Sequence, residues 1–326
     1  MVLFTLQNIS KYRTELMGFA ILGVLVGHVI AFSKWNMPIL DRIAHGIHTP
    51  GFLFLSGFGL FYSLSKNSKT IDFYKRRFWR FYLPFVLIVL PFLLRSLFTG
   101  NFYIWSFISQ ITTLNFWFYG NNNGMWYIAV SFALYVITPP IFHFITRNQN
   151  FVLTKFFLVI IGMIGINCGI KYISSNYWDM VEIGMKYTPM FFVGMLVAYV
   201  TKKGWGDGIV VAITTLLFGI LYIVMEIGGI VVPYIGVICK TLFYTLVLCV
   251  FLSILAKMSF TYLSKVLAWF GKYTLELYVL HLFINSLIKS PLFNLDNTKS
   301  IIIACVLSII LCMPTQKVIN SIIKRF

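Results

Sequence analysis

The sequence has few charged residues, very few acidic ones and no long hydrophilic stretch. Of its 326 residues 11% are charged, 9 are Asp or Glu, and 59% are apolar. A soluble globular protein has about 25% charged residues, so the composition excludes that class. The five cysteines are scattered through apolar segments without metal-ligand spacing, which indicates core residues and no metal site. No low-complexity tract or repeat is present, and we expect a single domain over residues 1–326.

Long apolar runs are what the sequence does contain. A hydrocarbon core about 30 Å thick takes about 20 helical residues to cross, and ten runs approach that length. They predict an all-α integral membrane protein, a bundle of about ten transmembrane helices. The predicted spans are 14–33, 47–65, 81–99, 125–145, 151–170, 184–200, 208–226, 230–256, 269–288 and 299–320. Residues 101–118 could form an interfacial or re-entrant helix instead of a loop.

The basic residues predict the orientation. The chain has 26 Lys and Arg and a formal charge of +17, and cytoplasmic loops of membrane proteins are enriched in these residues. With the N-terminus inside, most of them fall on the cytoplasmic side and Lys240 falls within a span. The other side collects only Lys34, Arg42, Arg95, Lys171, Lys186, Lys289 and Lys299. Both termini are therefore predicted to be cytoplasmic, and nucleic acid is not needed as a partner to explain the charge.

Two histidines lie deep in predicted spans, where ionisable side chains are costly and often functional. His28 lies about 21 Å into the first span and His281 about 18 Å into the ninth, at a rise of 1.5 Å per residue. We expect the two at similar depth. His281 also shares a polar helix face with Thr274, Tyr278 and Asn285. That face lines a cavity or another helix, with interhelical hydrogen bonding alone as the alternative.

Two further polar features lie near the ends of predicted spans. His48 opens the second span from the outside, where it could contact substrate or simply lie at the interface. On the cytoplasmic side, residues 70–84 (TIDFYKRRFWRFYLP) interleave aromatic residues with cations. The cations are Lys75, Arg76, Arg77 and Arg80. Arg76 and Arg80 share a helix face that suits a multiply phosphorylated ligand, whereas anionic lipid head groups explain the cluster without one.

The segment 100–124, predicted to lie outside, contains no Lys, Arg, Asp or Glu. It holds several aromatic residues and an asparagine triplet that ends at Asn123, close to Trp126. Aromatic faces beside amide donors could contact a neutral sugar, whereas an aromatic belt at the interface needs no ligand. The candidate substrate-binding residues are Asn123, Trp126, His48, Tyr278 and His281.

Five segments together resemble the acyltransferase-3 family, integral membrane O-acyltransferases that modify bacterial surface glycans. They are ELMGFAILGVLVGH at 15–28, HTPGFLFLSGF at 48–58, YKRRFWRFYLP at 74–84, MWYIAVSFALYVITP at 125–139 and GKYTLELYVLH at 271–281. They occur in order across most of the chain. A ten-helix bundle in the bacterial cytoplasmic membrane is what the resemblance implies.

The resemblance also implies partners and roles. Arg76, Arg77 and Arg80, with Lys75 beside them, are similar to the basic motif associated with a cytoplasmic acyl-CoA donor, here acetyl-CoA or another acyl-CoA such as succinyl-CoA. The implied acceptor is a surface glycan or a lipid-linked saccharide, and no metal is expected. His28 resembles the essential first-helix histidine of the family.

One departure from the family pattern concerns the first helix. Many members have an arginine eleven residues before the histidine, where this chain has Met17. Arg13 and Glu15 lie one turn nearer the cytoplasm, and we keep Glu15 with His28 as a candidate catalytic residue.

A mechanism follows from acyl transfer between a thioester and a sugar hydroxyl. The hydroxyl must lose its proton as it attacks, and a neutral imidazole is suited to accept that proton at neutral pH. His28 is therefore expected to act as a general base or as a covalent acyl relay. The rival interpretation is a transporter or flippase for a lipid-linked or polymeric glycan. No pair of broken helices in an inverted repeat supports it.

Overall fold

The computed structural model describes residues 4–33, 35–98, 103–120, 124–205, 208–230, 234–289 and 295–325. Within these ranges the secondary structure is helical and contains no β-strand. Eight helical segments there are long and apolar enough to cross a membrane. The prediction of an all-α integral membrane protein is confirmed.

The helices succeed one another with short connections. Their bounds are α1 Gln7–Lys11, α2 Arg13–Ser33, α3 Pro38–Ile47, α4 Thr49–Lys66, α5 Thr70–Arg77, the π-helical turn η1 Phe78–Tyr82, α6 Leu83–Phe98, α7 Ile104–Ile111, α8 Leu114–Tyr119, α9 Trp126–Thr146, α10 Val152–Ile173, α11 Ser175–Met185, α12 Thr188–Lys202, α13 Ile209–Ile227, α14 Ile235–Lys257, α15 Tyr262–Lys272, α16 Thr274–Ile288 and α17 Asn297–Ile323.

The eight segments, together with α4 and α16, correspond to the ten predicted spans. α4 has 18 residues and α16 has 15, and most of the residues of both are buried among other helices. A helix enclosed by protein can carry more polar residues than one that faces lipid, so α4 and α16 need not resemble a typical span. The predicted ninth span differs most from the structure. It is interrupted at Tyr273, where α15 ends and α16 begins.

For residues 101–118 the sequence allows a loop or an interfacial or re-entrant helix. Its described part forms two short helices, α7 and α8. Thr113 separates them with a left-handed backbone conformation at φ 62°, which α-helical geometry does not allow. Two short helices therefore border the bundle where one helix was considered.

Glycines allow two pairs of helices to cross at backbone contact. At the crossing of α4 with α12, a Cβ atom at Gly57 would meet the carbonyl oxygen of Phe191, and one at Gly194 would meet that of Phe54. The same reciprocal arrangement joins α2 to α15 through Gly18 and Gly271. Small residues at crossings are typical of membrane helices, whose association depends on close packing and not on expulsion of water.

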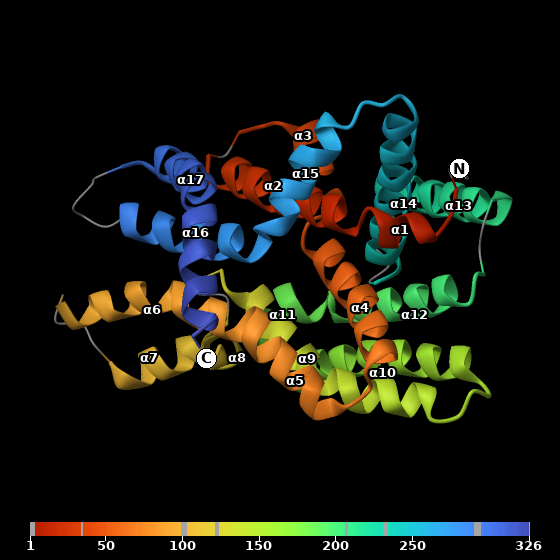
Figure 1. Cartoon of the computed structure of the whole chain (residues 1–326), viewed down its shortest axis with the longest axis horizontal. Helices are drawn as coiled ribbons and strands as arrows, with labels where there is room; N and C mark the ends of the chain where they lie inside the picture. Colours follow the sequence, from red (N-terminus) through yellow and green to blue (C-terminus); the bar gives the residue numbers. More distant parts are fainter. Residues whose placement is uncertain are drawn as a thin grey trace.

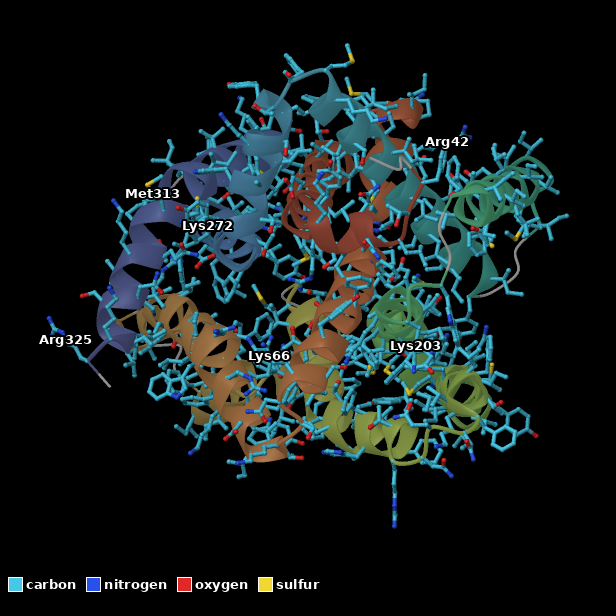
Figure 2. The ribbon with its side chains drawn as sticks, turned by 45° about the vertical axis from the view of Figure 1, so that its right-hand side comes forward. Arg42, Lys66, Lys203, Lys272, Met313 and Arg325 are labelled. Atoms are coloured by element: carbon cyan, nitrogen blue, oxygen red, sulfur yellow. The ribbon has the colours of Figure 1, made fainter. Side chains whose placement is uncertain are left out.

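The helices form two groups around α4. In Figure 1, α4 runs through the middle of the molecule, with α2, α15, α16 and α17 on one side and α9 to α12 on the other. Basic residues stand at several helix C-termini: Lys66 ends α4, Lys272 ends α15 and Arg325 follows α17 (Figure 2). These three lie on the side that the orientation prediction makes cytoplasmic.

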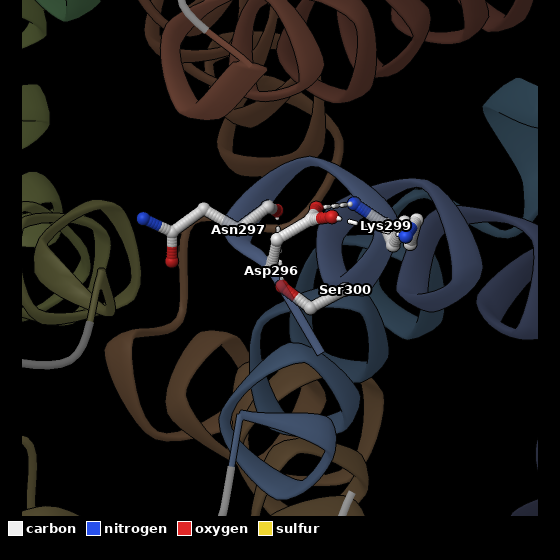
Figure 3. Close-up of polar contacts among 4 residues, drawn as sticks. All are labelled: Asp296, Asn297, Lys299 and Ser300. Carbon is white, nitrogen blue, oxygen red and sulfur yellow. Dashed lines mark hydrogen bonds and ion pairs between the residues drawn. The ribbon is translucent and has the colours of Figure 1, made fainter. Parts of the chain in front are cut away.

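A side-chain cap fixes the other end of α17. Asp296 Oδ1 accepts a 2.7 Å hydrogen bond from the backbone amide of Lys299, and Asp296 Oδ2 lies 3.4 Å from Lys299 Nζ (Figure 3). A carboxylate at this position satisfies an amide that has no partner within the helix. The cap therefore sets where the last helix begins.

Candidate active site

His28 of α2 and His281 of α16 meet inside the bundle, although 253 residues separate them in the sequence. His28 Nδ1 lies 2.8 Å from His281 Nε2, and the ring centroids are 5.1 Å apart. His281 is fully buried, whereas His28 is half-buried and lines a cavity. The similar depth expected for the two histidines corresponds to a direct contact.

The second ring nitrogen of His281 fixes the hydrogen positions in this pair. His281 Nδ1 lies 2.8 Å from the carbonyl oxygen of Leu277. That oxygen can only accept, so Nδ1 carries the hydrogen and Nε2 of the neutral ring is an acceptor. His28 Nδ1 must then donate to His281 Nε2. The neutral His28 ring consequently carries its lone pair on Nε2, as a histidine oriented for proton abstraction does.

His28 stands in the wall of a cavity of about 790 Å³, which we call the outer cavity because it lies on the side predicted to be outside. Phe32, Phe92 and Trp126 give it aromatic walls, and Asn285 adds an amide. The Asn285 Oδ1 atom is buried without a hydrogen-bond partner among the described residues. A buried polar atom of this kind is costly unless a ligand or water satisfies it.

A second cavity, of about 780 Å³, lies toward the predicted cytoplasmic side and is called the inner cavity. Four of its lining residues are cationic and one is acidic. These charged residues are Arg13, Arg77, Arg80, Lys272 and Glu276. Trp79 adds an indole to the wall. The cationic excess favours a ligand with several negative charges, and the fork-shaped guanidinium groups suit phosphate.

The two cavities lie at successive levels of the same helices. Met17 of α2 and Tyr127 of α9 line the inner cavity, whereas the neighbouring Trp126 lines the outer one. Tyr278 of α16 lines the inner cavity, and its hydroxyl donates a 2.7 Å hydrogen bond to the carbonyl oxygen of Gly124, which lines the outer cavity. Tyr278 therefore stands at the boundary, one helical turn from the histidine pair.

The structure places two of the four predicted cofactor-binding residues in the inner cavity, Arg77 and Arg80. Arg76 does not line the inner cavity. The Nη2 atom of Arg76 donates a 3.4 Å hydrogen bond to the carbonyl oxygen of Asn67. Lys75 is exposed and also outside the wall. The arginine pair that faces the cavity is thus Arg77 with Arg80, not Arg76 with Arg80.

The other predicted site residues are divided between the cavities and the surrounding structure. Glu15 accepts a 2.8 Å hydrogen bond from the hydroxyl of Ser264 and lines neither cavity. His48 likewise lines neither, and its ring lies 6.3 Å from that of Tyr187. Asn123 falls outside the described residues.

Sequence reasoning did not assign Lys272 or Trp79 to a ligand, and it gave Arg13 no clear place. Arg13 lies in the inner cavity, its Nε donates to the carbonyl oxygen of Leu55 at 3.2 Å, and a Cβ atom on Gly59 would lie 2.6 Å from its guanidinium. Gly59 leaves space for the Arg13 guanidinium because it has no side chain. The sequence shows this glycine, but only the packing of the helices shows that Arg13 occupies the space beside it. Within the described residues no group of His, Cys, Asp and Glu could hold a metal ion.

Comparison with known proteins identifies a family. A family model described as an acyltransferase domain matches residues 16–317. No curated protein and no solved structure matches the chain. The matched range contains the histidine pair and, except for Arg13, the charged residues that line the two cavities.

Proposed function

The chain belongs to the acyltransferase family that its match identifies, and on this premise we propose that it moves an acyl group, acetyl in the simplest case, from cytoplasmic acyl-CoA to a hydroxyl of a cell-surface or lipid-linked glycan. The observation that carries the proposal is the His28–His281 pair, in which His28 lines the outer cavity and His281 lies one helical turn from Tyr278 at the boundary with the inner cavity. The reaction would take place across the bacterial cytoplasmic membrane.

The inner cavity is the proposed site of the donor. Coenzyme A carries several phosphate charges, and the cations contributed by Arg13, Arg77, Arg80 and Lys272 supply matching donors. Trp79 offers a flat face for the adenine base. With the phosphates held there, the pantetheine arm would extend along α2 past Met17 toward His28, which lies eleven residues, or about 16 Å, farther along the helix.

In the proposed step His28 Nε2 takes the proton of the acceptor hydroxyl while the hydroxyl oxygen attacks the thioester carbonyl carbon. The carbon–sulfur bond then breaks, and the sulfur of coenzyme A leaves with the proton from Nε2. The products are the acylated glycan and free coenzyme A. His281 would act through His28 as a positioning residue, since its Nε2 accepts from Nδ1 in both charge states of His28.

A covalent relay is the variant of the same proposal. His28 Nε2 would attack the thioester, release coenzyme A and pass the acyl group to the hydroxyl in a second step. Rapid gel filtration at neutral pH after a reaction without acceptor separates the two, because only the relay leaves labelled acyl group on the protein.

The test uses the purified full chain in proteoliposomes with radiolabelled acetyl-CoA and surface glycan. We expect His28→Ala to reduce acyl transfer by about 100-fold or more, the range typical for loss of a general base. The matched control is His143→Ala, because His143 is an exposed histidine of α9 outside both cavities. The proposal is contradicted if a correctly folded His28→Ala protein transfers the acyl group at the full rate. It is also contradicted if the wild-type protein does not use acyl-CoA, as expected of a transporter.

A further inference from the structure

Two cations line the outer cavity without a carboxylate among its described lining residues. Arg95 of α6 and Lys289, directly after α16, both line this cavity, and none of its described lining residues is Asp or Glu. Neither cation belongs to an ion pair within the described ranges. The predicted external side of a membrane protein is where Lys and Arg are normally depleted. Two such residues in one cavity therefore call for a reason beyond topology.

The other described cations on that side have different surroundings. Three of them are neutralised by nearby carboxylates. These pairs are Arg42 with Glu226 at 3.6 Å, Lys186 with Glu182 at 3.7 Å and Lys299 with Asp296 at 3.4 Å. Lys171, the remaining described cation there, is exposed on α10 and lines no cavity. Of the described cations on that side, Arg95 and Lys289 are the two that share a cavity without an acidic residue in its described lining.

Lys289 is also close to the reacting centre. Its Nζ lies 4.2 Å from the centroid of the Phe32 ring, and that ring meets the His28 ring edge-on with 6.2 Å between centroids. One aromatic side chain thus separates the ammonium group from the histidine. A saccharide whose hydroxyl reaches His28 would carry its neighbouring groups toward Lys289 and Arg95.

We infer that the acceptor is an anionic saccharide, with a carboxylate or phosphate group close to the hydroxyl that is acylated. This inference rests on the proposed function and names the substrate class of its outer cavity. Arg95 offers paired donors for such an anionic group and Lys289 offers a point charge. The side chain of Asn285, which lines the same cavity, adds an amide to this site. The anionic oxygens can belong to an acidic sugar or to the diphosphate of a lipid carrier.

Three acceptor probes distinguish these sources with the wild-type protein in proteoliposomes and acetyl-CoA as donor. They are a neutral glucose tetrasaccharide, the matching tetrasaccharide ending in glucuronate, and an isoprenyl-diphosphate-linked glucose. We expect kcat/KM to be about ten-fold higher for at least one anionic probe than for the neutral one, and the preference to shrink as salt screens it. The preferred anionic probe identifies the source of the charge.

Variants test the assigned residues. Lys289→Gln combined with Arg95→Gln should abolish the preference for the anionic probe, whereas the control Lys171→Gln should retain it. Equal use of all three probes by the wild type, or a preference that survives the double substitution, overturns the inference while the proposed acyltransfer stands. The proposed function has its own readout, the release of coenzyme A that depends on His28, so failure of one is distinguishable from failure of the other.

Discussion

The inner and outer cavities have nearly equal volumes, about 780 and 790 Å³, but differ in the charges on their walls. The inner cavity gathers four cations around one carboxylate. The outer cavity has two cations and no acidic residue among those described. The difference teaches that the same helices can form, at two levels, a strongly cationic site and a less cationic one, with His28 in the wall of the second.

The largest expected effect comes from His281, the buried residue that contacts the histidine of the outer cavity. His281→Leu removes the acceptor of the His28 Nδ1 hydrogen, and we expect acyl transfer to fall by about 100-fold because the base loses its orientation. His281→Gln offers a side-chain oxygen that can accept the same hydrogen, so it should recover part of the rate. Steady-state rates at matched protein levels check this. Equal activity of the Leu and Gln variants would show that the contact only packs the helices.

The second largest effect is expected from substitutions of the cations that line the inner cavity. Arg77→Gln combined with Arg80→Gln removes two cations from its wall, and we expect the KM for acyl-CoA to rise about ten-fold or more with a smaller change in kcat. Lys75→Gln is the matched control, since this cation of the same segment does not line the cavity. Initial rates at varied acyl-CoA measure the difference. If Lys75→Gln raised the KM for acyl-CoA as much as the double variant does, the cations of this segment would serve membrane topology or lipid binding instead of donor binding.

A third prediction concerns Tyr278, which stands at the boundary between the inner and outer cavities. Tyr278→Phe removes the hydroxyl that donates to the Gly124 carbonyl oxygen, an interaction of about 1 kcal/mol. We expect the ratio of acyl-CoA hydrolysis to acyl transfer to rise about five-fold, because water then passes the boundary more easily. Tyr172→Phe, at a tyrosine 93% exposed on α10, is the control. An unchanged ratio would mean that Tyr278 does not separate the cavities.

The smallest effect concerns the outer end of α17, whose inner end contributes Gln316 and Asn320 to the inner cavity. The hydrogen bond from the Lys299 amide lowers the pKa of the Asp296 carboxyl. Its stabilising contribution is therefore present above the unfolded-state pKa of about 3.9 and is lost as pH falls through the lower folded-state pKa. Asp296→Ala should slightly lower Tm at neutral pH, and this difference should vanish in acid.

Thermal unfolding in detergent at several pH values measures that contribution. Asn297→Ala, at the next residue in Figure 3, is the control because the Asn297 contact drawn there uses its backbone carbonyl oxygen. A difference in Tm between wild type and Asp296→Ala that persists in acid would show that the carboxylate charge is not what matters.

Much of the fold could be predicted from the sequence because a lipid-facing helix must be both long and apolar. α10 and α13 illustrate this, since each is mostly exposed in the isolated chain and strongly apolar. The buried α16 was harder to delimit. Its break from α15 at Tyr273 lies within a continuous helical pattern, and the packing of α15 against α2 through Gly18 and Gly271 accompanies that break.

The candidate site was predictable only in part. His28 and His281 could be singled out individually, because an ionisable group deep in a span is unusual and the depth follows from helical rise. Their contact could not be predicted, since hydropathy does not say which helices are neighbours. The same limit applies to Lys272, which sequence reasoning counted as one more cytoplasmic cation and which the structure places on the inner cavity wall.

The sequence by itself determined the class of protein, the approximate spans and the residues whose polarity is costly in a membrane. Each of these depends on local composition along one helix. Only the tertiary structure decided that His28 donates to His281, that Arg77 and not Arg76 faces a cavity with Arg80, and that Arg95 and Lys289 line one cavity whose described lining contains no carboxylate. Those relations arise where helices distant in sequence cross, and the crossings are set by the side chains of both partners together.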